Sequence, residues 1–194
     1  MPLPSVQARL ADFQTDIDRL NDWTARMPSG SRWVERLNEM RLVRATLAWE
    51  DFLEQTLYCF LRGSTSVSGR NYRLAVTTAT SLADAELLAR GTDPYGRWLN
   101  ELWVLGRTNA LFSPTNPFAL LASPTFREVR VIRNRIVHRS RIVRADFLAV
   151  ALVLHGSARP GITPGRLLSE LAGPQFRIET YLQSLRAAAQ LIAA

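Results

Sequence analysis

The chain has 194 residues, enough for one domain with a sizeable core. Apolar residues make up 47% and charged residues 21%, a balance that is typical of a globular protein and excludes an intrinsically disordered one. All 24 basic residues are arginine, the formal net charge is +7, and the lone Cys59 excludes an internal disulfide. Because the sequence holds neither an apolar run of about 18 residues nor a signal-peptide pattern, we expect no membrane association and a cytoplasmic location.

Apolar residues recur at helical spacing in two stretches of the first third. Residues 5–27 predict a first helix, and residues 28–31 form a short polar break. Residues 32–62 predict a long, central second helix that ends at Gly63.

One seam of this second helix combines apolar and acidic residues. Its members are Val43, Leu47, Glu50, Glu54, Leu57 and Leu61. A buried carboxylate is costly unless it is paired, so we expect Glu50, and with it Glu54, to orient Arg133 or His138 of the arginine-rich segment later in the chain. The alternative is that this seam faces solvent or a partner. Cys59 lies nearby and is interpreted as a small core residue rather than a nucleophile.

The middle of the chain alternates loops and short helices. Residues 64–73 predict a polar loop, either an RNA-contacting segment or an ordinary surface loop. Short helices are predicted over 81–90 and 94–105, with Trp98 and Trp103 in core positions, followed by a connector over 106–123.

Arginines are concentrated between residues 127 and 144, REVRVIRNRIVHRSRIVR. Ser123-Pro124 resembles an N-cap and first-turn proline, so we predict one helix through the whole segment. Four apolar residues mark its buried face: Val129, Ile132, Ile136 and Val143. A neighbouring stripe carries Arg130, Asn134, His138 and Arg141, with Arg133 between the two. A solvated run of charge is the alternative interpretation.

These side chains suit metal-free phosphate chemistry. Arginine binds phosphate bidentately, and histidine exchanges protons near neutral pH. We predict His138 as general base or acid for attack of an RNA 2′-OH on phosphorus, Arg133 as electrostatic clamp and Asn134 as positioning group. The two proton transfers are better served by two histidines, which favours a dimer. No metal-ligand spacing or cofactor motif occurs, so we expect neither a metal nor a cofactor.

Arg133-Asn134-Arg135-Ile136-Val137-His138 resembles the R-N-x-x-x-H signature of the HEPN superfamily. The acidic stretch WEDFLE at residues 49–54 is similar to an early helix of the RiboL-PSP-type subgroup. The resemblance implies an all-helical fold and a homodimer with a composite active site. It also implies metal-independent RNA cleavage in a toxin or antiviral-defence setting, restrained by an antitoxin or a sensor/effector partner. Some HEPN toxins carry a modifiable tyrosine two residues beyond the histidine, where this chain has Ser140.

The last fifty residues predict further helices. Residues 145–155 form a short apolar core helix, with His155 interpreted as its C-terminal cap rather than as a second catalytic histidine. A break follows over 156–165, then a brief helix over 166–172, and Pro174 opens the final helix.

The fold class is therefore all-α: a HEPN-like helical bundle with a long central helix and a C-terminal helical extension. One domain is expected over 1–194, with the motif-bearing core at 31–155 and the extension at 164–194.

The predicted function is a metal-independent endoribonuclease that leaves 2′,3′-cyclic phosphate and 5′-OH ends. Four arginines are expected to contact the RNA: Arg130, Arg135, Arg139 and Arg141. The main alternative is a non-catalytic HEPN-like nucleotide- or RNA-binding module, or a helical interaction subunit of a defence complex. A DNA-binding arginine helix is a third possibility.

Overall fold

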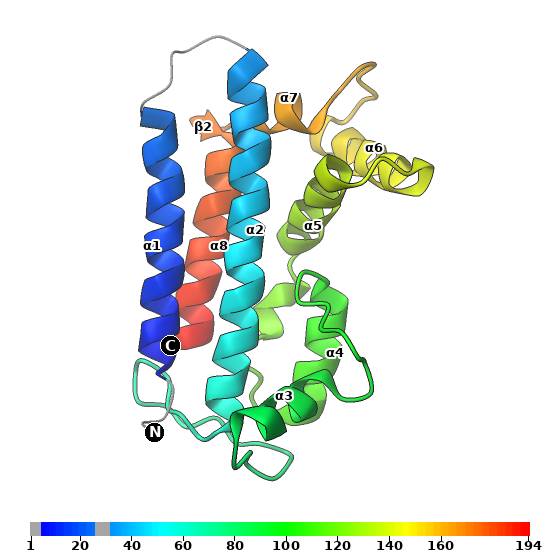
Figure 1. The fold of residues 1–194 in the computed structure, drawn as a ribbon. Helices are drawn as coiled ribbons and strands as arrows, with labels where there is room; N and C mark the ends of the chain where they lie inside the picture. The colour runs from blue at the N-terminus through cyan, green and yellow to red at the C-terminus, as the bar shows by residue number, and fades with distance from the viewer. Residues whose placement is uncertain (1–4, 26–31) are drawn as a thin grey trace. The chain divides into compact units, whose positions relative to one another are not determined.

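The computed structural model describes residues 5–25 and 32–194, and Figure 1 shows that this part of the chain is mainly helical. Its only sheet has two strands of two residues each, so the all-α prediction is confirmed. The break predicted at residues 28–31 lies outside the described residues. No described helix has the length and apolar character needed to cross a membrane.

The elements in chain order are α1 (Val6–Ala25), α2 (Arg32–Leu61), α3 (Leu82–Arg90), α4 (Glu101–Leu111), the 3-10 helix η1 (Ala119–Ala122), α5 (Pro124–Val137), α6 (Arg141–His155), α7 (Pro164–Leu168), β1 (Leu171–Ala172), β2 (Gln175–Phe176) and α8 (Arg177–Ala193).

These elements form two compact units, each assembled from separate stretches of chain. Unit 1 comprises Met1–Asp16, Ala48–Ser123 and Leu185–Ala194, and unit 2 comprises Ile17–Leu47 and Pro124–Ser184. Helices α1, α2 and α8 each contribute to both units, so these boundaries differ from the predicted core and extension.

Aromatic side chains fill the core of unit 1. Phe13 of α1 packs against Trp49 and Phe52 of α2, with ring centroids 5.7 and 5.3 Å away. Trp98 is buried as predicted, in a T-shaped contact with Trp103 at 5.2 Å. Cys59 is also buried, which agrees with the predicted core position, and burial raises the pKa of its thiol to about 11.

The loop over 64–73 belongs to unit 1 and is joined to the end of α8. The Ser66 hydroxyl donates to the Ala194 carbonyl at 2.7 Å, and the Val67 backbone N–H donates to the Ala193 carbonyl at 2.7 Å. These two hydrogen bonds hold the loop against the C-terminal end of α8.

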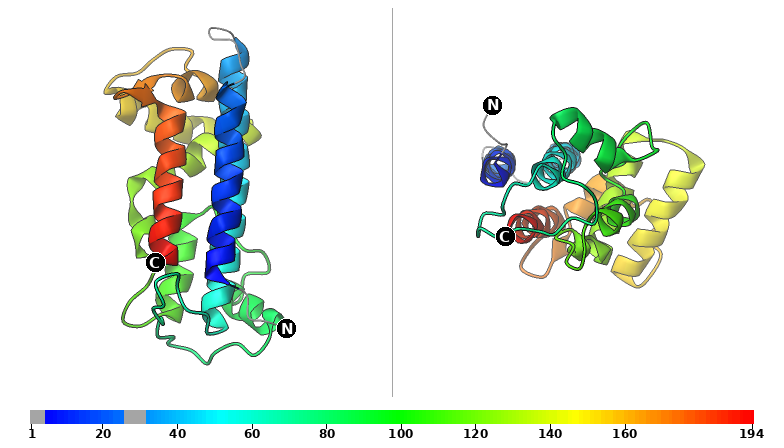
Figure 2. Two further views of the ribbon diagram at one scale, coloured as in Figure 1. Left: turned by 90° about the vertical axis from the view of Figure 1, so that its left-hand side faces the viewer. Right: turned by 90° about the horizontal axis from the view of Figure 1, so that it is seen from below.

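Unit 2 is built around α5, which contacts both α6 and α7 (Figure 2). Val129 and Ile132 of α5 and Phe147 and Ala151 of α6 are buried in its core. From α8, Ile178, Tyr181 and Leu182 add to the same core.

The second short helix of unit 1 begins later than predicted. Residues 94–100 form turns, and α4 begins only at Glu101. The Asn100 side chain caps it by accepting hydrogen bonds from the backbone N–H groups of Leu102 at 3.2 Å and Trp103 at 3.3 Å. The predicted range of 94–105 was wrong at both ends, because the N-cap Asn100 places the start of α4 at Glu101 and the helix continues to Leu111. The predicted connector over 106–123 in fact contains the rest of α4 and η1.

The single helix predicted through residue 144 was also wrong, because residues 138–140 separate α5 from α6. The apolar spacing continues across this break, so periodicity alone could not reveal it. The start of α6 is marked instead by Ser140, whose side chain accepts a hydrogen bond from the Val143 N–H at 3.3 Å.

The predicted core helix is only half buried. Phe147, Val150 and Ala151 face the interior, whereas Ile142 and Val153 are 76% and 79% exposed. The apolar composition of α6 therefore reflects two faces, one buried and one exposed.

Near the C-terminus a small β-hairpin lies where the helix over 166–172 was predicted to end and the final helix to begin. Helix α7 ends at Leu168, and β1 and β2 then pair antiparallel, with Leu171 opposite Phe176. Gly173 adopts φ +74° in the turn, a conformation that favours glycine. Pro174 lies in this turn, and α8 begins three residues later at Arg177.

Candidate functional site

Helix α5 carries Arg133 and Asn134 beside its buried face, and His138 follows the helix. Phe126, Val129 and Ile132 are buried and fix the helix against the rest of unit 2. Arg133 and Asn134 are half-buried on its flank. The interior packing thus holds these two polar side chains at the surface in a fixed orientation.

His138 lies immediately after the last residue of α5. Its backbone N–H still donates to the Asn134 carbonyl at 2.8 Å, which places it one helical turn beyond that residue. The side chain is exposed, and its imidazole contacts no polar partner within residues 5–25 and 32–194. Both ring nitrogens are therefore accessible to a ligand.

The motif residues are brought together in part. The Arg133 guanidinium donates from Nη1 to Asn134 Oδ1 at 3.4 Å, so these two side chains are coupled. Arg135 donates from Nη1 to the His138 carbonyl at 3.3 Å, where a cation satisfies an acceptor at a helix C-terminus. Arg133, Asn134 and Arg135 thus lie in the C-terminal part of α5, and His138 follows directly after the helix.

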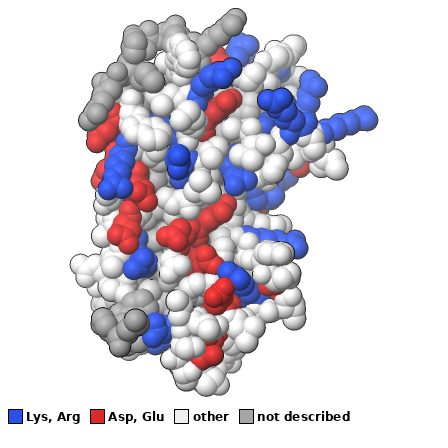
Figure 3. All heavy atoms as spheres, viewed as in Figure 1, with Lys and Arg blue, Asp and Glu red and all other residues white. Residues whose placement is uncertain are grey.

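Further arginines follow in the turn and in the first part of α6. Arg139, Arg141 and Arg144 are exposed, and in the described part of the chain none of them pairs with a carboxylate. Arg130 is half-buried on α5. Figure 3 shows arginine side chains gathered over the α5 and α6 region of unit 2. We call Arg133, Asn134, Arg135, His138, Arg139, Arg141 and Arg144 the basic corner.

Clustered guanidinium groups suit a polyanion. Each can bind a phosphate oxygen bidentately, and several along a turn and two helix ends can follow successive phosphates. An exposed imidazole in the same place can accept or donate a proton.

The predicted supporting carboxylates belong to unit 1. Glu54 Oε1 accepts a hydrogen bond from the Tyr58 hydroxyl at 2.6 Å, and Arg90 Nη2 lies 3.5 Å from the same oxygen. Burial, followed by this bond to Glu54, raises the pKa of Tyr58. Glu50 is half-buried on α2. Their role in orienting Arg133 or His138 stays a prediction.

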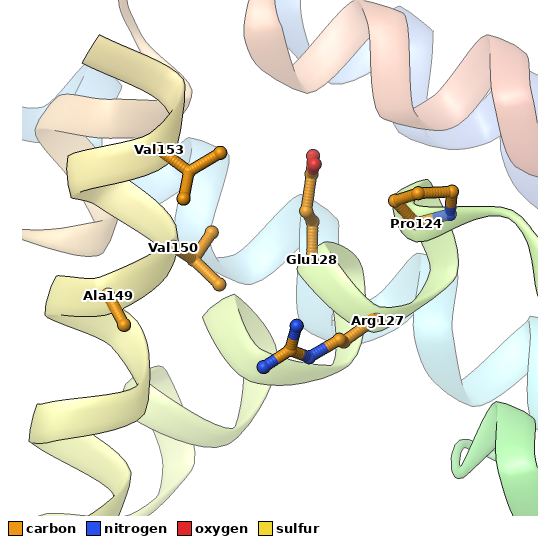
Figure 4. Close-up of a pocket in the computed structure, with 6 residues that line it drawn as sticks. All are labelled: Pro124, Arg127, Glu128, Ala149, Val150 and Val153. Carbon is orange, nitrogen blue, oxygen red and sulfur yellow. The ribbon is translucent and has the colours of Figure 1, made fainter. Parts of the chain in front are cut away.

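A small cavity of about 170 Å³ lies between α5 and α6, away from the basic corner. Its lining residues are Pro124, Arg127, Glu128, Ala149, Val150 and Val153. In Figure 4 the Glu128 carboxylate points up between Pro124 and the valines of α6. That carboxylate accepts a hydrogen bond from the Tyr181 hydroxyl at 2.9 Å, and burial together with the charge of Glu128 raises the pKa of Tyr181.

A buried arginine in unit 2 was not predicted. Arg41 is fully buried and binds Glu179 through two nitrogens, at 2.7 and 3.2 Å. Its other donors reach the Leu20 carbonyl, Asn21 Oδ1 and Asn38 Oδ1, at 3.0 to 3.3 Å. The five N–H groups of the guanidinium thus all have acceptors, which identifies a structural residue.

The second histidine is also engaged in structure. His155 is the last residue of α6, its side chain is 4% exposed, and its Nε2 lies 2.5 Å from Glu170 Oε2. Glu170 also pairs with Arg159 at 3.1 Å. His155 therefore lies at the end of the helix, but the C-cap is Gly156, and the His155 side chain binds Glu170 instead of capping α6.

The chain matches no protein-family model, no curated protein and no solved structure.

Proposed function

We propose that this protein is a metal-independent endoribonuclease that binds and cleaves RNA at the basic corner. The observation that carries the proposal is the position of His138, exposed directly after α5 and close in sequence to Arg139, Arg141 and Arg144, which pair with no carboxylate in the described residues. The resemblance of residues 133–138 to the HEPN motif and the helical fold support the same proposal.

In the proposed reaction, the 2′-oxygen of a ribose attacks the adjacent phosphorus and forms a new P–O bond. The bond from phosphorus to the 5′-oxygen breaks, so the products carry a 2′,3′-cyclic phosphate and a 5′-OH. His138 takes the 2′-OH proton or supplies the proton that the leaving 5′-oxygen needs, and solvent water carries out the other proton transfer. Arg133 stabilises the added negative charge on the phosphoryl oxygens, and Asn134, coupled to Arg133, positions it.

The arginines beyond the motif supply binding rather than chemistry in this proposal. Arg139 and Arg141 contact phosphates on either side of the scissile bond, and Arg130 and Arg135 extend the same positive surface along α5. RNA binding then weakens steeply as salt concentration rises.

The proposed setting is toxin or antiviral defence, as the HEPN resemblance implies. A homodimer and a restraining antitoxin or sensor partner are part of the proposal. Ser140 caps α6, so the hydroxyl at the position that is modified in some HEPN toxins has a structural role here.

The test is cleavage of bulk RNA and of a tRNA pool by purified protein in EDTA, with the product ends mapped. We expect wild-type cleavage with cyclic phosphate ends, and a loss of at least about 100-fold in His138→Ala and in Arg133→Ala. Arg166→Ala, an exposed arginine of α7 outside the basic corner, is the matched control and should cleave normally. Cleavage that persists in His138→Ala would exclude the proposed mechanism.

The second candidate function is an RNA- or nucleotide-binding module without catalysis. It is favoured by the imidazole of His138, which has no orienting hydrogen-bond partner in the described residues. This function predicts RNA binding without cleavage in the wild type, with binding retained in His138→Ala and lost when Arg139 and Arg141 are both changed to Ala.

A further inference from the structure

One face of α6 is apolar and exposed along the whole helix. Its members are Ile142, Ala145, Leu148, Ala149, Leu152 and Val153. At about 100° per residue these positions form one continuous stripe, opposite the buried Phe147, Val150 and Ala151. Single exposed apolar residues are ordinary on a protein surface, but a continuous stripe on one helix indicates an interaction surface.

The charges at the two ends of α6 favour an antiparallel pair of these helices over a parallel pair. Arg141 and Arg144 lie at its N-terminal end, whereas the C-terminal end carries the negative end of the helix dipole, and Glu170 nearby is paired with His155 and Arg159. A parallel pair would bring the arginines of both copies together. An antiparallel pair instead places the arginines of each copy beside the C-terminal end of the other helix.

The edges of the stripe point to the same arrangement. Asp146 lies at one edge of the stripe, and Arg127 of α5 lines the cavity on that side, next to Ala149, Val150 and Val153. Both Arg127 and Asp146 are exposed, and neither makes an ion pair within residues 5–25 and 32–194. In an antiparallel pair centred near Leu148, Asp146 of one copy lies opposite Ala149 of the other and reaches its Arg127.

The cavity between α5 and α6 could hold a side chain of the second copy. Its volume of about 170 Å³ is smaller than an ordinary small-molecule pocket and is suited to a single side chain. Val150 and Val153 give it an apolar wall. In the same antiparallel pairing, the exposed Ile142 of the second copy lies opposite Val153 and can enter it.

We propose that two copies of this chain associate through antiparallel α6 helices, with Arg127 of each copy paired to Asp146 of the other. This inference does not rest on the ribonuclease proposal. It also differs from the composite site that the HEPN resemblance implies. At 1.5 Å per residue, the two Arg141 α-carbons stand roughly 20 Å apart along the axis, so the basic corners lie at opposite ends of the paired helices.

The first test is the oligomeric state, measured by sedimentation over a range of concentrations. The wild type is expected to be a dimer. Ala149→Arg places a charge in the middle of the interface and should weaken association roughly 100-fold or more. The matched control is Ala83→Arg, also an exposed alanine but on α3, which should remain dimeric. A monomeric wild type, or an Ala149→Arg variant that still dimerises normally, would overturn the proposal.

The second test examines the orientation. Arg127→Asp and Asp146→Arg should each weaken the dimer roughly three- to tenfold, because each places like charges together. The double variant restores the pair with its charges exchanged and should regain wild-type association. Failure of the double variant to recover would reject the antiparallel pairing. Because none of these residues belongs to the basic corner, RNA cleavage measured in parallel reports separately on the proposed function.

Discussion

Arg41 is a fully buried arginine in the interior of unit 2. A guanidinium buried without partners would be strongly unfavourable, but here all five donors meet acceptors, two of them on Glu179. Lysine has three donors and lacks the planar fork, so it cannot replace this set. The position therefore requires arginine, and it differs in this respect from the exposed arginines of the chain.

We predict that Arg41→Ala lowers the free energy of unfolding by roughly 3 kcal/mol, because Glu179 and two asparagines lose their partner in the interior. The value is at the lower end for a buried pair, since the Glu179 side chain is 28% exposed. Arg41→Lys should also be destabilising, whereas Arg166→Ala should change stability by less than about 0.5 kcal/mol. Urea unfolding measures all three, and a stable Arg41→Ala protein would contradict this account.

Cys59 provides a test of packing in unit 1. Its thiol is 1% exposed, and its pKa of about 11 leaves roughly one molecule in a thousand as thiolate at pH 8. We therefore expect a thiol-reactive dye to label the native protein very slowly and the guanidinium-unfolded protein at once. Rapid labelling of the native protein would show that this part of α2 opens readily.

At the scale of elements, the three-residue break between α5 and α6 determines where His138 lies. Ser140 defines the break because its hydroxyl caps α6. We predict that Ser140→Ala costs about 1 kcal/mol in unfolding free energy and that Ser140→Asp keeps most of the stability, since aspartate is also a good N-cap. Urea unfolding distinguishes them. If both variants lost the same unfolding free energy, the capping hydrogen bond would not be the way in which Ser140 stabilises the protein.

Helices with strong local signals could be predicted from sequence. Within the described residues, the ranges of α1, α2 and α3 agree closely with expectation because their apolar spacing is regular, and Ser81 also marks the start of α3 through a complete capping box with Asp84. The later boundaries failed where two local signals competed. Asn100 rather than Pro94 begins α4, and Ser140 divides a periodic pattern that continues on both sides.

The sequence predicts which residues form the candidate site, but it does not predict their long-range surroundings. The motif residues are close in sequence, so their clustering at the end of α5 follows from helix geometry. Two partners of Arg41, Asn21 and Glu179, lie 20 and 138 residues away, and no local pattern indicates which arginine becomes buried. The exposed face of α6 was missed because apolar composition does not distinguish a buried face from an unpartnered one.

At the scale of the whole molecule, each unit holds one tyrosine with a raised pKa: Tyr58 in unit 1 and Tyr181 in unit 2. Burial is the first cause for both, and the carboxylates of Glu54 and Glu128 add to it. A raised folded-state pKa means that the native protein keeps these protons longer than the unfolded chain, whose tyrosines titrate near pH ~10. The stability from this source is therefore full below about pH 10 and is lost as pH rises further.

We expect the unfolding free energy to fall steadily above about pH 10, and to fall less steeply in a Tyr58→Phe/Tyr181→Phe double variant. Urea unfolding between pH 8 and pH ~11 measures the slope, with Tyr95→Phe, an exposed tyrosine of unit 1, as control. Equal slopes in the double variant and the wild type would show that these two hydroxyls do not couple folding to alkaline pH.

The interleaving of the chain through both units has a consequence for synthesis on the ribosome. Unit 1 takes its last stretch from Leu185–Ala194, and unit 2 takes stretches on both sides of residues 48–123. A growing chain that has reached residue 123 therefore holds most of unit 1 but lacks its final helical segment, and it has only the first stretch of unit 2. Leu57 and Leu61, both fully buried in the finished molecule, emerge long before α8 is made. Apolar surface is thus exposed during most of translation, a period in which chaperones that bind such surface would act.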